Sequence, residues 1–145
     1  MPRPVAFGDR LRYLADNMTD PAQPTTVLLA IEGPRATITL NDPAKHNRLD
    51  PAGLRALRAA IEKADADPAV RVTVVTGAGE KTFCSGYDLG SISASERRSQ
   101  AADDDTFEKV MDRLEAMRMP TLCALNGGVY GGATDLALAC DFRLG

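Results

Sequence analysis

Two short apolar segments, each followed at once by a glycine-rich loop, place the strongest limit on the fold. The first segment, VRVTVVTG, stops at Gly77, and the second, TLCAL, is followed by NGGVYGG. Apolar runs of this length are typical of buried strands in parallel sheets. Parallel neighbours need a long crossover connection, which is usually a helix. Helical patterns do alternate with these strands, so the sequence predicts an α/β fold with parallel pairing.

Two helices are indicated by apolar residues that recur at helical spacing. In the first helix these residues are Leu54, Leu57, Ile61 and Ala64. In the second they are Phe107, Val110, Met111, Leu114 and Met117. Asp50 is a good N-cap for the first helix, and Pro51 stands at the favoured first helical position. Pro120 ends the second helix.

Outside these elements the chain divides into an extension and one domain. Residues 1–26 are proline-rich and polar and are expected to form an N-terminal extension, and residues 27–145 form the domain. Residues 91–105 are polar and charged, so we expect them to form mobile surface.

The two ends of that domain also carry strand and helix signals. It begins with a hairpin, in which strands 27–31 and 36–40 flank the turn 32–34. An apolar helix is expected from about Gly132 to Cys140, and FRLG then begins another strand.

Composition excludes several classes of protein. The chain is 44% hydrophobic and 26% charged and has a net charge of −3, which argues against a nucleic-acid binder. The three cysteines form no CxxC pair, so neither a zinc site nor a disulfide framework is predicted, and a reducing cytoplasm fits best. An apolar signal-peptide core and a membrane-spanning run are both missing from the sequence. We therefore expect a cytoplasmic protein that does not contact a membrane.

The glycine run from Gly127 to Gly132 allows three interpretations. It can be a tight turn with close packing. It can also be a phosphate loop, because Gly127 and Gly132 have the GxxxxG spacing, but Ala133 stands where the lysine that reaches the phosphates belongs. The third interpretation is an oxyanion hole, since N–H groups at a helix N-terminus have no partner inside the helix. The small-residue loop TFCSGYDLG could supply the second N–H donor.

Three motifs in order resemble the crotonase superfamily, the enoyl-CoA hydratases and isomerases. They are ITLNDPAKHNRLD, TGAGEKTFCSGYDL and MPTLCALNGGVYGGATDLALACDFRLG, and the resemblance runs from about Val27 to Gly145. It implies a spiral of ββα units, present here as its N-terminal half and incomplete at the C-terminus. It further implies an acyl-CoA thioester as substrate, in fatty acid metabolism, and a homotrimer or dimer of trimers. Coenzyme A would enter as part of the substrate, with no metal or redox cofactor.

The resemblance also assigns roles to individual residues. The N–H groups of Tyr87 and Gly132 would bind the thioester oxygen and stabilise an enolate, and Asp135 would position water or move a proton. The residues expected beside coenzyme A are Lys45, Arg48, Ser85, Gly86, Asp88, Leu89 and Gly131. Lys45 and Arg48 fall where the family contacts the adenine, mostly through backbone atoms.

Two departures from the family pattern leave the reaction open. The hydratases carry a glutamate where this chain has Asp135, and an aspartate there resembles the dienoyl-CoA isomerases. The hydratases also place a second acid beyond the position of Gly145, and their fold continues past it, so activity is expected to need further polypeptide. From the overall resemblance, the expected function is still that of a hydratase-like lyase. The alternatives are a dienoyl-CoA isomerase or an acyl-CoA-binding homologue without catalysis.

Other reactive residues fit simpler interpretations. His46 is the single histidine, and no serine or cysteine partner is evident for it. Cys84 lies in the second small-residue loop, but no base accompanies it, so packing is expected. GAGEKT lacks the third glycine of a dinucleotide loop, and the acidic run 103–105 is expected to lead into a helix rather than to bind a metal.

Overall fold

The computed structural model of the chain describes residues 26–88, 90 and 106–145. The extension predicted at 1–26, apart from Thr26, lies outside the described residues, as does the polar segment 91–105. Leu89, which the resemblance places beside coenzyme A, also lies outside them. No helix of the described residues is long and apolar enough to cross a membrane.

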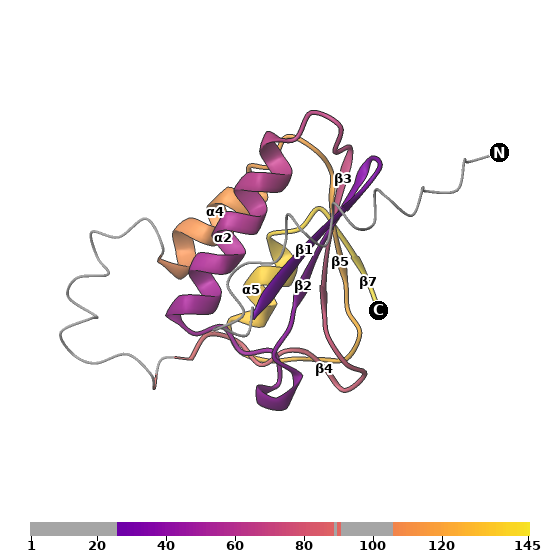
Figure 1. The fold of residues 1–145 in the computed structure, drawn as a ribbon. Helices are drawn as coiled ribbons and strands as arrows, with labels where there is room; N and C mark the ends of the chain where they lie inside the picture. Colours follow the sequence, from indigo (N-terminus) through magenta and orange to yellow (C-terminus); the bar gives the residue numbers. More distant parts are fainter. Residues whose placement is uncertain (1–25, 89, 91–105) are drawn as a thin grey trace, which may run out of the picture.

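A five-stranded sheet in the order β1-β2-β3-β5-β7 forms one layer of the fold (Figure 1). Its strands are β1 (Val27–Glu32), β2 (Arg35–Leu40), β3 (Val72–Gly77), β5 (Thr121–Ala124) and β7 (Phe142–Leu144). The first pair is antiparallel, and every later pair is parallel. The predicted parallel pairing and the predicted hairpin are both confirmed.

The hairpin turn is closed by Gly33 and Pro34, because Glu32 and Arg35 are already paired. Gly33 has a φ of 57°, a left-handed conformation that glycine adopts without steric cost. The turn therefore fixes the register in which Ile38 and Leu40 are both buried.

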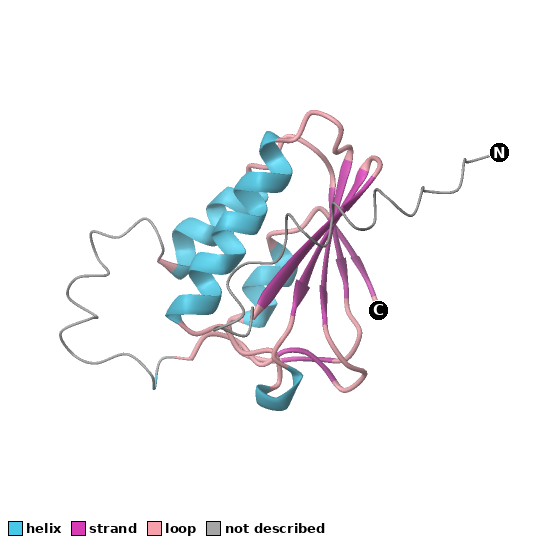
Figure 2. Ribbon diagram, in the orientation of Figure 1, coloured by secondary structure: helices cyan, strands magenta, loops and turns pink. Residues whose placement is uncertain are grey.

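The helices lie on one face of the sheet (Figure 2). They are α2 (Pro51–Ala66), α4 (Phe107–Glu115) and α5 (Ala133–Leu138), and η1 (Pro43–Lys45) is a short 3-10 turn. Asp50 caps α2 as predicted, since its Oδ1 accepts a hydrogen bond from the Gly53 N–H at 2.7 Å. Leu54 and Leu57 of α2 and Leu114 of α4 are fully buried in the core between helices and sheet. The predicted apolar faces of α2 and α4 therefore do form the helix layer.

Two elements were not predicted. β4 (Thr82–Cys84) and β6 (Gly128–Val129) pair in parallel as a separate two-stranded sheet, although the sequence indicated loops in both places. Both strands are short, and β6 begins inside the glycine run. A Cβ atom on Gly127 would lie 2.4 Å from the backbone carbon of Lys81, so no side chain fits there. Gly127, the first residue of the glycine run, thus serves close packing, which was the simplest of the three interpretations.

The ends of two predicted helices differ from the structure. α5 runs from Ala133 to Leu138 instead of from Gly132 to Cys140, and Gly132 is its N-cap. α4 ends at Glu115, so Met117 packs against the core from the following turn. At the C-terminal ends, apolar residues such as Met117 and Cys140 continue the helical pattern after the backbone hydrogen bonds have stopped. At the start of α5, Gly132 flanks the helix as its N-cap.

Candidate functional site

The connections that follow β2, β3 and β5 meet at one end of the sheet, and two asparagines tie them together. Asn47 is buried, and its Nδ2 donates to the carbonyls of Ala78 and Thr82, each at 2.9 Å. Its Oδ1 accepts a hydrogen bond from the Asp42 N–H at 3.0 Å. Asn47 has a φ of 54°, which asparagine tolerates better than most residues. One side chain therefore closes its own loop and anchors the next.

Asn126 holds the same connection from the opposite side. Its Oδ1 accepts from the Gly77 N–H at 3.0 Å, and its Nδ2 donates to the Gly79 carbonyl at 2.7 Å. Both asparagines approach the site of a Cβ on Gly77 to 2.9 Å, so only glycine fits at the end of β3. The three connections are thus held in one arrangement by the side-chain amides of the buried Asn47 and the half-buried Asn126. The sequence analysis used Asn47 only as part of a motif and missed this role for both residues.

The peptide group between Gly86 and Tyr87 has a defined direction. The Leu49 N–H donates to the Gly86 carbonyl at 2.9 Å, and the Asp88 N–H donates to the Leu49 carbonyl at 2.8 Å. These two bonds make the parallel bridge between Leu49 and Tyr87. In a trans peptide the C=O and N–H bonds point in opposite directions. Because the Gly86 carbonyl points toward Leu49, the Tyr87 N–H points away from it.

Gly132 presents its N–H outward from the start of α5. The Gly131 carbonyl accepts a hydrogen bond from the Thr134 N–H at 3.0 Å and so points along the helix. The Gly132 N–H, which shares that peptide group, points the other way. Among the residues that the structure describes, none accepts a hydrogen bond from it. This group is available to an external acceptor.

The two peptide groups are brought together by a close approach of their glycines. Gly86 has a φ of 99°, and a Cβ on it would lie 3.0 Å from the Gly132 nitrogen and 2.9 Å from the Tyr130 carbonyl. The Tyr130 N–H also donates to the Cys84 carbonyl at 3.2 Å, so β4 and β6 carry the two glycines into contact. The structure therefore places the segments of both predicted donors side by side.

Phe107 is a member of the site that sequence analysis assigned to the core. Its ring lies 5.7 Å from the Tyr87 ring, centroid to centroid. A Cβ on Gly132 would come within 3.1 Å of the tip of the same ring. Phe107 thus touches the residues of both predicted donors. Phe107 is the first residue of α4 and is half-buried, whereas Val110 and Leu114 are buried. Its place at the start of the helix is the sequence feature that distinguishes it from these core residues.

Asp135 lies on the first turn of α5, one turn after Gly132. Its side chain is exposed, and within the described part of the chain its carboxylate makes no hydrogen bond or ion pair. It does not cap a neighbouring backbone group, which was the structural alternative to a catalytic role. A carboxylate in this position is open to solvent and to a ligand.

The remaining predicted contacts fall into two groups. Ser85, Gly86, Asp88 and Gly131 lie in the two segments that meet at the site, and Gly131 has a φ of 55°. Lys45 is exposed in η1, and Arg48 forms an ion pair with Asp88. A surface pocket beside these loops is lined by Pro43, His46, Asn47, Ala78, Gly79, Glu80, Lys81 and Thr82. Neither Lys45 nor Arg48 lines it.

The thiols and acidic groups do not form a second reactive centre. Cys84, Cys123 and Cys140 are buried and unbridged. Burial raises the pKa of the Cys84 thiol, although the hydrogen bond from the Gly86 N–H to its Sγ opposes this. The described residues contain no group of three or more histidine, cysteine or acidic side chains that could hold a metal ion.

Sequence comparison relates the chain to acyl-CoA enzymes. The enoyl-CoA hydratase/isomerase family matches residues 32–144. The probable enoyl-CoA hydratase EchA14 of Mycobacterium tuberculosis is 38% identical over 130 residues, which is 85% of this chain and 48% of that protein. The crotonyl-CoA hydratase of Syntrophomonas wolfei is 35% identical over 121 residues, 81% of this chain and 45% of that protein. The chain thus spans about half the length of the curated relatives it matches.

A solved structure gives the same result for the fold. The crystal structure of an enoyl-CoA hydratase/carnithine racemase from Magnetospirillum magneticum matches with a TM-score of 0.76 and 32% identity. The match covers 92% of this chain and 49% of that chain. The predicted crotonase-like fold is confirmed, over about half the length of that structure. This chain belongs to the enoyl-CoA hydratase/isomerase family.

Proposed function

We propose that the protein acts on an acyl-CoA thioester and stabilises its enolate in an oxyanion hole made by the N–H groups of Tyr87 and Gly132. The observation that carries this proposal is the close approach of Gly86 to Gly132, together with the direction of the Gly132 N–H out of α5 and of the Tyr87 N–H away from Leu49. A thioester oxygen between the two segments could accept two hydrogen bonds at once. Side chains larger than hydrogen would block the approach on the Gly86 side.

The chemistry follows from where negative charge develops. Removing a proton next to a thioester carbonyl, or adding water to an enoyl double bond, moves charge onto the carbonyl oxygen. Two fixed N–H donors stabilise that charge more than they stabilise the neutral carbonyl, which lowers the barrier. This step uses donors of the protein backbone alone. Coenzyme A enters as part of the substrate, and the proposal includes no other cofactor.

Asp135 is proposed to position water or to move a proton. It stands three positions after Gly132 on α5, and residues three apart lie on the same side of a helix. The carboxylate is exposed, and none of the residues that the structure describes binds it. Aspartate is one methylene shorter than the glutamate of the hydratases, which favours the dienoyl-CoA isomerase alternative. A non-catalytic acyl-CoA binder is the remaining alternative.

The proposed binding segment for the substrate follows the loops that meet at the site. Ser85, Gly86, Asp88 and Gly131 would line the thioester end of the pantetheine arm, and Leu89 and Lys45 would extend the contact. We further propose a homotrimer or a dimer of trimers. Sedimentation equilibrium of the protein at its natural full length checks that assembly.

A binding and turnover experiment tests the proposal. The protein at its natural full length is titrated with a short saturated acyl-CoA and with coenzyme A alone, and enoyl-CoA hydration and double-bond isomerisation are then assayed. Tighter binding of the thioester than of coenzyme A supports the hole. Hydration, isomerisation or binding without turnover then separates the three functions. Equal affinity for coenzyme A and the thioester, without turnover, would contradict the proposal.

A further inference from the structure

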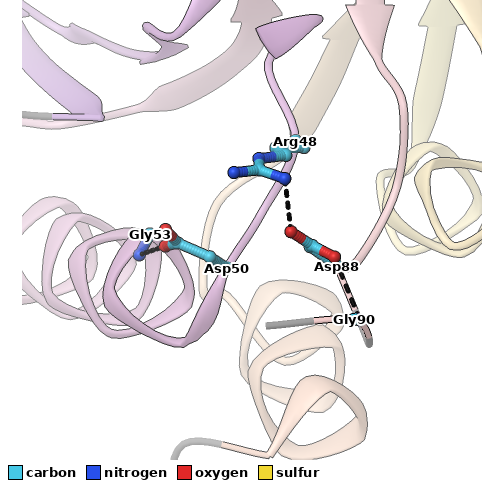
Figure 3. Close-up of polar contacts among 5 residues, drawn as sticks. All are labelled: Arg48, Asp50, Gly53, Asp88 and Gly90. Carbon is cyan, nitrogen blue, oxygen red and sulfur yellow. Dashed lines mark hydrogen bonds and ion pairs between the residues drawn. The ribbon is translucent and has the colours of Figure 1, made fainter. Parts of the chain in front are cut away.

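Arg48 and Asp88 join two connections that are 40 residues apart in the chain. The Arg48 Nη1 lies 2.5 Å from the Asp88 Oδ2 (Figure 3). The second carboxylate oxygen, Oδ1, accepts a hydrogen bond from the Gly90 N–H at 3.0 Å. Arg48 directly precedes Leu49, and Asp88 directly follows Tyr87. The ion pair therefore lies beside the backbone bridge that directs the Tyr87 N–H.

The Arg48–Asp88 ion pair is monodentate, not bidentate. Only Nη1 of Arg48 meets the carboxylate, and the buried Nε has no hydrogen-bond partner among the described residues. The two side chains are 38% and 19% exposed, so water screens the pair only in part. A lysine ammonium could make the same single contact, whereas a neutral side chain could not.

The ion pair partly offsets the arginine charge and directs Nη1 of Arg48 toward Asp88. Arg48 does not line the neighbouring surface pocket. The Arg48 side chain is thus directed to Asp88, and the coenzyme A contact that the resemblance implies at this position, mostly through backbone atoms, stays a prediction.

The donor peptide needs an external restraint on its orientation. Gly86, which precedes Tyr87, is the residue type with the greatest backbone freedom and adopts a φ of 99° here. Rotation about its backbone bonds would change the direction of the Tyr87 N–H. Two hydrogen bonds to Leu49 oppose that rotation, and the Arg48–Asp88 pair closes the same junction through side chains.

We propose that Arg48 and Asp88 are positioning residues that hold the Tyr87 N–H in the oxyanion hole. The inference rests on the proposed function, because it assumes that this N–H binds the thioester oxygen. It predicts that losing the pair weakens polarisation of the substrate carbonyl and slows the reaction without a matching loss of affinity.

The test measures the carbonyl directly. Difference infrared spectra are recorded for a saturated acyl-CoA, labelled with ¹³C at the thioester carbonyl, bound to the protein at its natural full length. In the parent the carbonyl band should shift to lower frequency. Arg48→Met should lose part of that shift and lower kcat by about 10-fold, with KM within about 3-fold, since small misplacements of catalytic groups cost up to about 100-fold. Arg48→Lys should restore both the shift and kcat.

Matched variants separate positioning from general destabilisation. Asp88→Asn should also lose part of the shift, and adding Arg48→Met to Asp88→Asn should cost less than Arg48→Met costs alone, because the ion pair is already removed. Arg35→Met is the control: it removes an ion pair with Glu32 in the β1–β2 hairpin, and it should leave the band and kcat unchanged.

Three results would overturn the inference, and they differ in what else they affect. A parent shift that Arg48→Met retains in full shows that the pair does not position the donor, and the proposed function stands. A large rise in KM at unchanged kcat and unchanged shift makes Arg48 a coenzyme A contact. A parent protein that binds the thioester with no carbonyl shift has no oxyanion hole, and the proposed function falls together with this inference.

Discussion

The ring tip of Phe107 occupies the space that a side chain on Gly132 would need. An ideal Cβ on Gly132 would lie 3.1 Å from the Phe107 Cζ, closer than most real Cβ contacts. Gly132→Ala should therefore destabilise the protein by roughly 1 kcal/mol, because the ring must move. In a Phe107→Leu background the same change should cost less. A urea-denaturation cycle of the four proteins measures this coupling, and equal costs in both backgrounds would contradict it.

Removing the Gly132 N–H requires a change in the backbone itself. Proline at this position would delete the donor, but Gly131 has a φ of 55°, and proline drives its preceding residue to the extended region. An ester in place of the Gly132 peptide bond deletes the N–H without that conflict. We expect turnover to fall by about 10²–10³, the usual loss for one oxyanion donor. An ester at Gly33, in the β1–β2 turn, is the control, and parent turnover with the Gly132 ester would rule out this donor.

Asp135→Asn tests the proposed proton or water role. The change keeps the shape of the side chain and removes its charge, so turnover should fall by about 10²–10⁴ while acyl-CoA affinity stays within a few-fold. Asp135→Glu should raise hydration relative to isomerisation. Steady-state assays and calorimetric titration of the full-length variants provide the check. Unchanged turnover in Asp135→Asn would leave the residue without a catalytic role.

Asp141 should give the fold a specific dependence on acid. Hydrogen bonds from the Thr121 N–H at 2.8 Å and the Thr121 hydroxyl at 3.0 Å lower the pKa of the Asp141 carboxyl below its usual range. Above about pH 3.9, the ordinary value for aspartate, both folded and unfolded states are ionised and the stabilisation is fully present. As pH falls from there through the lowered folded-state pKa, the unfolded state takes up the proton first, and the stabilisation is lost.

Asp141→Asn should therefore be less stable than the parent at neutral pH, and the difference should shrink below about pH 3.9. Denaturant titrations of both proteins at a series of pH values measure it. A difference that stays constant down to pH 2 would show that the Asp141 charge does not stabilise the link between β5 and β7.

The exposed apolar side chains of β7 should make the isolated 145-residue chain self-associate. Phe142 and Leu144 are 61% and 64% exposed. Arg143 between them bonds carbonyls at the end of α5, so its neighbours face the opposite side of the sheet. In sedimentation velocity, Phe142→Lys with Leu144→Lys should reduce association, and Leu28→Lys on β1 is the control. A monomeric parent chain would contradict this expectation.

The sequence by itself determined the local elements and their order. The Asp50 cap, the spacing of Leu54 and Leu57, and the alternation around Gly33 each depend on residues a few positions apart. Short-range capping bonds and apolar periodicity set these features wherever the segment is placed. The three motifs in order also led to the correct family. The short strands β4 and β6 were not predicted, because a strand of two or three residues is too short to show a periodic pattern.

Only the tertiary structure decided the arrangement of the site. The direction of the Tyr87 N–H depends on bonds to Leu49, and the position of Phe107 depends on how α4 packs against α2. The Arg48–Asp88 pair joins residues 40 positions apart. Nothing local fixes such contacts, because each arises from burial of apolar surface between separate elements and from closure of long loops. The sequence named the candidate donors, and packing of the chain placed their two segments side by side.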